Sequence, residues 1–195
     1  MFRRSPSPPP SGSAIAQQTV AVFGLGPIGL GSVIMQTHLG RRVIGIDRAP
    51  ARLELARKLG AGHVIESSAA ADVPAAIRSL THNAWADVAI EAAGVPATAK
   101  LCFPSVRKGG LVIFNGEPPA VELSSSEDFI RRDITATGSW FYHFHEYADM
   151  LALARNGLPV TSLITHRFPL ADAAQAFSAM TGGLSGKVLL FYDSP

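Results

Sequence analysis

Two hydrophobic patterns alternate along the chain from about residue 19. Short apolar runs rich in β-branched residues are separated by longer stretches in which apolar residues recur at helical spacing. The runs predict strands at 20–23, 43–46, 63–66, 87–91, 109–114 and 134–139. The stretches between them predict helices at 27–39, 48–60, 71–82 and 96–106, with a short helix before the sixth strand. This alternation is typical of an α/β protein with a doubly wound, parallel, six-stranded Rossmann sheet in the order 3-2-1-4-5-6.

The C-terminal part of the chain lies beyond this set of six strands. Apolar spacing predicts helices at about 146–155 and 171–180, followed by a last strand at 187–191. Because the six-strand set is complete without it, we expect this C-terminal helix–strand extension to pack on something else.

The first strand runs directly into a glycine-rich turn, Gly24-Leu25-Gly26-Pro27-Ile28-Gly29. Gly24 permits the tight turn, Gly26 lets a pyrophosphate approach the backbone, and Gly29 lets the next helix pack close to the strand. Pro27 suits the first helical turn, where its missing N–H costs nothing. The helix N-terminus offers free N–H groups and partial positive charge to a diphosphate.

An acid completes this pattern at the end of the second strand. Asp47 follows Gly29 by 18 positions, close to the spacing expected for the carboxylate that binds a ribose 2′-hydroxyl. Its charge favours NAD over NADP, since it repels a 2′-phosphate. The neighbouring Arg48 leaves an alternative open, because an arginine there can stack on adenine or tolerate phosphate.

The N-terminal residues 1–18 form a break in composition. Proline and serine dominate them, so we expect a disordered leader. They contain no continuous apolar segment of the kind a secretory signal has. A transit peptide is the alternative, although the prolines oppose an amphipathic helix.

Composition narrows the classes of partner. The 195-residue chain has a net charge of only +2 and no concentrated lysine or arginine, which argues against nucleic acid. Its apolar runs are too short for a membrane span. The single cysteine, Cys102, excludes an intrachain disulfide and favours a small buried side chain in a cytoplasmic protein.

Three stretches together resemble the C-terminal half of the medium-chain dehydrogenases, the zinc-type alcohol and polyol dehydrogenase family. They are Val20 to Gly29, then Glu91-Ala-Ala-Gly94 with Gly109-Gly-Leu-Val, and Ile164 to Leu170 with Ala173, Ala176-Phe177 and Gly186-Lys187-Val. The resemblance extends from about residue 19 to 193, and Thr165 to Leu170 is similar to sorbitol dehydrogenases in particular. It implies a domain at 19–157 that binds NAD and a segment at 158–195 that packs on the family's catalytic domain.

The resemblance also implies roles for particular residues. The turn from Gly24 to Gly29 would hold the pyrophosphate, and Asp47 with Arg52 would bind the adenosine ribose. Asn115, Gly116 and Glu117 would approach the nicotinamide through backbone groups, with Trp140 and Phe141 near the same ring. The complete set of expected cofactor-binding residues is Gly24, Gly26, Pro27, Ile28, Gly29, Asp47, Arg52, Ala93, Gly94, Asn115, Gly116 and Glu117.

The family's zinc is a point of departure. Full members place zinc ligands in a catalytic domain that precedes the cofactor domain, and nothing before Thr19 matches it. The cluster His143-Phe-His145-Glu146 is the only candidate within the chain, and we interpret it as a loop with ordinary exposed histidines. Tyr142 and Tyr147 lack a lysine four positions on, so we assign no catalytic and no metal-binding residue.

Two functions remain open at this point. The chain is either the NAD(H)-binding portion of a zinc-type alcohol or polyol dehydrogenase, inactive in isolation, or a stand-alone dinucleotide-binding module without catalysis. We expect a homodimer through the edge of the Rossmann sheet. We also expect self-association through an apolar surface on the C-terminal segment, formed by Val160, Leu163, Ile164, Phe168, Val188, Leu190 and Phe191.

Overall fold

The computed structural model describes residues 18–68, 70–183 and 185–192. Its centre is a six-stranded sheet in the order β3-β2-β1-β4-β5-β6, with every neighbouring pair parallel. The strands are β1 (Thr19–Phe23), β2 (Arg42–Asp47), β3 (His63–Glu66), β4 (Ala86–Glu91), β5 (Val106–Phe114) and β6 (Thr135–Gly138). The strand order confirms the doubly wound Rossmann sheet.

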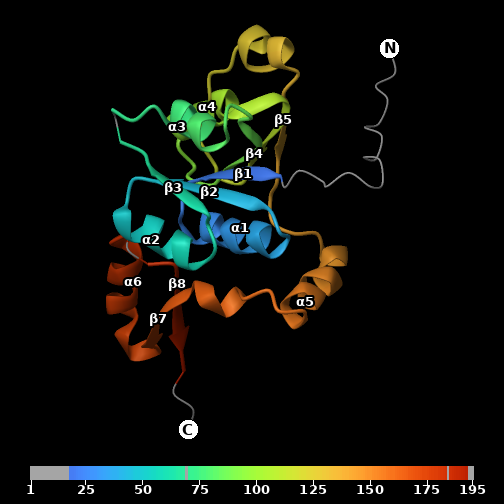
Figure 1. The fold of residues 1–195 in the computed structure, drawn as a ribbon. Helices are drawn as coiled ribbons and strands as arrows, with labels where there is room; N and C mark the ends of the chain where they lie inside the picture. The colour runs from blue at the N-terminus through green and yellow to red at the C-terminus, as the bar shows by residue number, and fades with distance from the viewer. Residues whose placement is uncertain (1–17, 69, 184, 193–195) are drawn as a thin grey trace.

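Helices cover both faces of this sheet (Figure 1). On one face lie α1 (Pro27–His38) and α2 (Pro50–Lys58), and on the other lie α3 (Val73–Leu80) and α4 (Pro96–Ser105). All five residues of β1 are buried, because β1 is central and has helices above and below it. Alternate residues of β1 therefore belong to two apolar clusters, one with Ala21 and Phe23 and the other with Val20 and Val22.

The fifth strand begins earlier than the sequence predicts. β5 starts at Val106 rather than Gly109, because Val106 still pairs with Ala86 before the register shifts between Ala86 and Val88. Cys102 is free and fully buried on α4, as predicted. Burial raises the pKa of its thiol well above the ordinary value, and the charge of Glu91 adds to this. No helix within the described ranges combines the length and apolar character of a membrane span.

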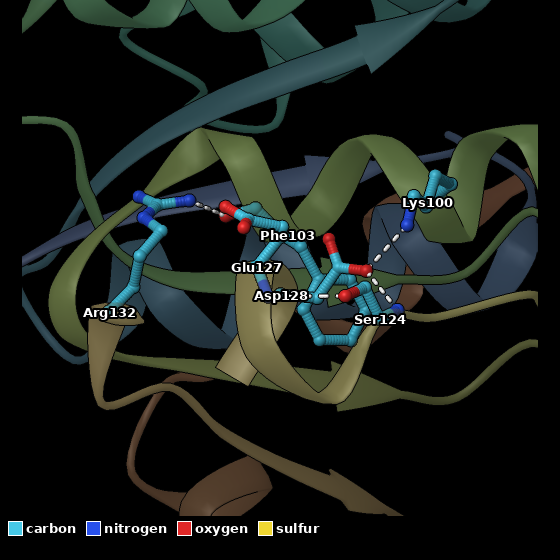
Figure 2. A network of polar contacts seen from close by, with 6 residues as sticks. All are labelled: Lys100, Phe103, Ser124, Glu127, Asp128 and Arg132. Carbon is cyan, nitrogen blue, oxygen red and sulfur yellow. Dashed lines mark hydrogen bonds and ion pairs between the residues drawn. The ribbon is translucent and has the colours of Figure 1, made fainter. Parts of the chain in front are cut away.

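A short irregular segment joins β5 to β6 and is tied to α4. It consists of a π-helical turn, η1 (Ser125–Phe129), and a 3-10 turn, η2 (Ile130–Arg132). Lys100 of α4 contacts the Asp128 carboxylate at 2.5 Å, and the Ser124 N–H donates to the same oxygen at 2.7 Å. Figure 2 shows this network beside Arg132, which donates to the carbonyl of Phe103 at 2.7 Å.

The same arginine closes the end of α4. Arg132 also donates to the carbonyl of Val106, so its guanidinium satisfies two carbonyls at the helix C-terminus, where intrahelical donors run out. Burial alone would raise the pKa of Asp128. The hydrogen bonds from Lys100 and Ser124, with the charges of Lys100 and Arg132, outweigh that effect and lower it.

The C-terminal region continues as a series of short elements. They are η3 (Phe144–Glu146), α5 (Tyr147–Arg155), η4 (Val160–Leu163), β7 (Ile164–Pro169), η5 (Leu170–Asp172), α6 (Ala173–Thr181) and β8 (Lys187–Phe191). β7 and β8 pair in parallel as a separate two-stranded sheet. The expected helix–strand extension is therefore a strand–helix–strand unit. Its first strand escapes the sequence analysis, although Ile164, His166 and Phe168 alternate with more exposed residues.

This unit does not lie apart from the Rossmann helices (Figure 1). Leu163 packs against the apolar cluster beneath α1 and α2, and α1 contacts η4 directly. A Cβ added to Gly186 would lie 3.3 Å from Cδ2 of Leu55 on α2. The extension therefore has part of its contact surface within this chain. The sequence predicts a disordered leader at residues 1–18, and residues 1–17 lie outside the described part of the chain.

The expected apolar surface is smaller than predicted. Val160, Leu190 and Phe191 are exposed, but Leu163, Ile164, Phe168 and Val188 are only partly exposed because they pack within the unit or beneath α1. A larger set of exposed apolar side chains precedes it around η3 and α5. These are Trp140, Phe141, Tyr142, Phe144, Tyr147 and Met150.

Candidate functional site

The glycine turn between β1 and α1 has the geometry that its sequence predicts. Gly24 has φ +86°, a conformation that favours glycine, and its N–H donates to the carbonyl of Ile46 at 2.8 Å. A Cβ on Gly29 would lie 1.8 Å from the carbonyl oxygen of Gly24, so α1 reaches its position only with glycine there. A Cβ added to Gly26 would meet no atom within 4 Å apart from its chain neighbours, and Pro27 and Ile28 are exposed beside it. The turn therefore leaves the N-terminus of α1 accessible.

Asp47 is tied to this turn by its side chain. Its Oδ2 accepts a hydrogen bond from the Leu25 N–H at 2.7 Å, and its Oδ1 accepts one from the Ala49 N–H at 2.9 Å. Arg52 on α2 places Nη1 3.7 Å from the same Oδ2. The side chain of Asp47 is 8% exposed. The carboxylate expected to bind the ribose therefore lies directly beside the turn expected to hold the pyrophosphate.

A second loop follows β4 and contacts the glycine turn. A Cβ on Gly24 would lie 2.7 Å from the backbone and Cβ of Ala93, so the two loops touch there. Gly94 has φ +68°, and a Cβ on it would lie 3.3 Å from the backbone nitrogen of Glu117. This second contact joins the loop after β4 to the loop after β5.

The third loop follows β5. The N–H groups of Asn115 and Gly116 both donate to the carbonyl of Glu91, at 2.8 and 2.9 Å. The Asn115 amide donates to the carbonyl of Ser139 at 3.3 Å, which links the loop to the end of β6. The structure thus brings the expected cofactor-binding residues of all four strand ends to one edge of the sheet.

The two aromatic residues after β6 are not packed against this edge. Trp140 and Phe141 are 69% and 79% exposed, and they contact each other edge to face with ring centroids 4.8 Å apart. Their predicted place beside the nicotinamide stays a prediction.

Two hollows lie near the strand ends. One, of about 490 Å³, lies between α1 and the ends of β4, β5 and β6; its lining includes Ile28, Ser32, Ile113, Asn115 and Ser139. The other, of about 530 Å³, lies beside α4; its lining includes Pro96, Lys100, Glu122 and Ser124. The first adjoins the glycine turn and is the one that fits the predicted cofactor edge.

Sequence reasoning missed Glu91, the last residue of β4. It is fully buried, and its Oε1 accepts hydrogen bonds from the N–H groups of Ala93 and Gly94 at 2.9 and 3.0 Å. Burial raises the pKa of its carboxyl, against the lowering effect of hydrogen bonds from the backbone of Ala93, Gly94 and Val95. The available signal was an acid at the end of an apolar strand directly before a glycine-containing loop.

Unpaired polar atoms also gather at this edge. Among the described residues, two buried side-chain polar atoms lack a hydrogen-bond partner, Arg52 Nε and Glu91 Oε2. Glu91 accepts hydrogen bonds from the loops after β4 and β5, and Arg52 lies beside Asp47. Since native proteins satisfy most buried polar groups with protein atoms, water or ligands, both atoms are open to a further partner at this edge.

The residues of the described chain do not fit a zinc site. They contain no group of three or more histidine, cysteine, aspartate or glutamate side chains placed to hold a metal ion. The rings of His143 and His145 stack with centroids 5.6 Å apart. The Glu146 carboxylate accepts a hydrogen bond from the N–H of His143 at 2.6 Å, which is a helix-capping contact.

Comparison with known proteins places this geometry in a family. Residues 27–156 match the family model described as zinc-binding dehydrogenase. An uncharacterized zinc-type alcohol dehydrogenase-like protein from Escherichia coli, YphC, is 33% identical over 187 residues, which is 92% of this chain and 51% of that protein. An L-threonine 3-dehydrogenase from Chromobacterium violaceum is 33% identical, over 89% of this chain and 51% of its own.

Solved structures agree. The 2R,3R-butanediol dehydrogenase of Bacillus subtilis superposes with a TM-score of 0.81 at 26% identity, covering 92% of this chain and 52% of its own. The alcohol dehydrogenase of Thermus sp. ATN1 gives a TM-score of 0.80 at 29% identity, covering 90% and 51%. The chain spans about half the length of the relatives it matches. It belongs to the zinc-binding dehydrogenase family and matches the cofactor-binding half of its members.

Proposed function

We propose that this chain binds NAD(H) as the cofactor-binding portion of a zinc-type alcohol or polyol dehydrogenase. The observation that carries the proposal is the bond between Asp47 Oδ2 and the Leu25 N–H, 2.7 Å long, which fixes an acid beside the glycine turn. That arrangement presents a carboxylate to a ribose and a helix N-terminus to a diphosphate on the same nucleotide.

Each part of the edge has a role in this proposal. Gly26, Pro27 and Ile28, at the start of α1, would contact the pyrophosphate, and Gly24 and Gly29 would shape the turn that holds it. Asp47 would accept hydrogen bonds from the adenosine ribose, with Arg52 at its side. The loops after β4 and β5 would position the nicotinamide through their backbone; their residues are Ala93, Gly94, Asn115, Gly116 and Glu117. Bound NAD⁺ supplies the hydride acceptor for alcohol oxidation.

The relatives support a hydroxyl compound as the substrate of the whole protein. By their names, two of them are dehydrogenases of L-threonine and of 2R,3R-butanediol. Both compounds carry secondary hydroxyl groups, which agrees with the proposed reaction of a secondary alcohol with NAD⁺.

We propose no catalytic step for the described residues alone. Zinc chemistry needs three protein ligands, and the described histidines and acids do not supply such a set. The purified 195-residue chain is therefore expected to show no polyol oxidation with NAD⁺, with or without added zinc. The test is to follow the absorbance of newly formed NADH after NAD⁺ and each of a panel of polyols are added to the protein. Zinc-dependent turnover of any polyol would contradict the expectation.

Two further parts of the proposal rest on the resemblance and the fold. β6 ends the sheet, so its outer edge is open to pairing with a second copy. Sedimentation equilibrium would detect such a homodimer. A cytoplasmic location suits a protein with one free, buried cysteine.

The alternative function is a stand-alone dinucleotide-binding module. The observation that favours it is the apolar core, which Val20 to Ile134 supply almost entirely. A dinucleotide could then bind and stabilise this part of the chain without any chemistry.

The experiment that tests the proposal is calorimetric titration with NADH and NADPH. The wild type is expected to prefer NADH, because the Asp47 charge repels a 2′-phosphate. Asp47→Asn keeps an oxygen that can accept the Leu25 bond but removes the charge, so the preference should fall by about tenfold or more. Asp47→Ala should weaken NADH binding as well.

The control is Asp149→Asn on α5, an exposed acid far along the chain from the glycine turn, which should leave both affinities unchanged. Equal or tighter binding of NADPH by the wild type would contradict the NAD assignment. An unchanged preference in both Asp47 variants would remove Asp47 from the site.

A further inference from the structure

Glu91 is a fully buried acid whose surroundings are mostly apolar. In the sheet it lies between Phe23 of β1 and Phe114 of β5, and its relative exposure is 0%. Burying a carboxyl group among such neighbours is unfavourable unless hydrogen bonds compensate it. The presence of an acid here therefore needs an explanation beyond packing, since an apolar side chain between these two phenylalanines would carry no desolvation penalty.

The hydrogen bonds that the side chain and the carbonyl of Glu91 accept come from the two loops proposed to position the nicotinamide. Its Oε1 accepts from Ala93 and Gly94 in the loop after β4, at 2.9 and 3.0 Å. Its backbone carbonyl accepts from Asn115 and Gly116 in the loop after β5, at 2.8 and 2.9 Å. One residue thus fixes the first residues of both loops.

The second carboxyl oxygen interlocks the loops by shape. A Cβ added to Gly116 would lie 2.3 Å from Glu91 Oε2 and 2.4 Å from the backbone nitrogen of Gly94. Oε2 is buried and has no hydrogen-bond partner, so it touches the third loop without bonding to it. The loops and the Glu91 carboxyl can approach this closely only while residue 116 is glycine.

We propose that Glu91 is a positioning residue that holds the loops 92–94 and 115–117 together and so shapes the nicotinamide half of the site. Asp47, which bonds to the glycine turn, shapes the adenosine half. This inference rests on the proposed NAD(H) function. It predicts that binding of the adenosine half depends on Asp47 and that binding of the nicotinamide half depends on Glu91.

NADH and ADP-ribose distinguish the two halves, because ADP-ribose lacks the nicotinamide. Glu91→Met keeps the length of the side chain and removes both oxygens. The ratio of the NADH to the ADP-ribose dissociation constant should rise at least about tenfold in this variant, because the backbone hydrogen bonds that order the loop are lost. Glu91→Gln keeps an amide oxygen for Ala93 and Gly94, so it should retain most of the wild-type ratio.

Gly116→Ala provides a second route that leaves Glu91 intact. Its added methyl group would push the two loops apart, so the same selective loss of NADH binding is expected even if Glu91→Met does not fold. Glu127→Met is the matched control. Its exposed carboxylate pairs with Arg131, four residues further on in η2, and the ratio should not change.

Three results would overturn the inference. Wild-type affinity for NADH in Glu91→Met and in Gly116→Ala would show that the loops do not need the interlock. An equal loss of both ligands in a folded variant would show a general structural role. Wild-type protein that binds neither ligand would overturn the proposed function and this inference with it.

Discussion

Residues 19–138 and residues 139–192 contribute very differently to the packing of this molecule. Of the buried hydrophobic residues in the described chain, all but Ala176 lie between Val20 and Ile134. The later region has many exposed large side chains instead, including Phe144 at 92%. No residue of α5 is buried.

The difference shows what each region requires from outside itself. The first region closes two apolar clusters with its own helices, one on each face of the sheet. The later region touches the first chiefly through Leu163 and the neighbourhood of α1 and α2. We infer that the first region determines the stability of the fold and that the later region is attached to it.

Truncating a buried aromatic ring should give the largest change in the free energy of unfolding, and this change should differ most between the two regions. Phe103 is fully buried and contacts Phe129 and Phe114, with ring centroids 5.2 and 6.2 Å away. Phe103→Ala should lower the free energy of unfolding by about 3 to 5 kcal/mol. Phe144→Ala, in the later region, should change it by less than about 0.5 kcal/mol.

Urea unfolding of both variants, followed by circular dichroism, measures the two changes. Comparable losses would mean that the later region is as important to the fold as the Rossmann core. Such a result would remove the contrast altogether.

Substituting Asp128 should lower the free energy of unfolding by a smaller amount, and this loss should depend on pH. Its pKa is lowered in the folded protein, so the folded state binds fewer protons than the unfolded state near that pH. The resulting stabilisation is complete above the ordinary pKa of aspartate, about 3.9, and disappears as the pH falls through the lower folded value. Asp128→Asn should therefore cost about 1 to 2 kcal/mol at pH 7.

The matched variant is Asp149→Asn on α5, where the side chain is exposed. It should leave the unfolding curve unchanged at every pH. Denaturation midpoints at pH 7 and near pH 3 separate the cases, because the gap between wild type and Asp128→Asn should narrow in acid. A gap of constant size would show that the charge of Asp128 does not contribute to stability.

The sequence predicts the elements whose signals are local. The strand order, the glycine turn and the buried Cys102 all follow from short patterns, and the structure has them. Asp47 is found because its spacing from Gly29 is a recognisable one. The hydrogen bond that holds it beside the glycine turn, from the Leu25 N–H, spans 22 positions in the chain.

The features that sequence analysis missed depend on distant neighbours. Glu91 looks like any acid at a strand end, and its burial results from β1 and β5 on either side. The contacts of Lys100 with Asp128 and of Arg132 with Phe103 join residues 28 and 29 positions apart. The partial covering of Leu163 depends on how the last unit meets α1, which no local pattern encodes.

The smallest predicted effect lies at the junction of the two regions and tests whether they are packed as the structure has them. Gly31 lies inside α1, and a Cβ there would be 4.0 Å from Cδ1 of Leu163, an ordinary van der Waals distance. Gly31→Ala should raise the free energy of unfolding by about 0.5 to 1 kcal/mol, because alanine favours the helix. Gly29→Ala, two positions earlier, should instead destabilise the protein, since its methyl group would meet the Gly24 carbonyl at 1.8 Å. Urea midpoints of Gly31→Ala in the wild type and in Leu163→Ala separate helix propensity from contact between the regions. Part of the gain should disappear without Leu163, and a loss of stability from Gly31→Ala alone would show that η4 packs closer to α1 than this arrangement allows.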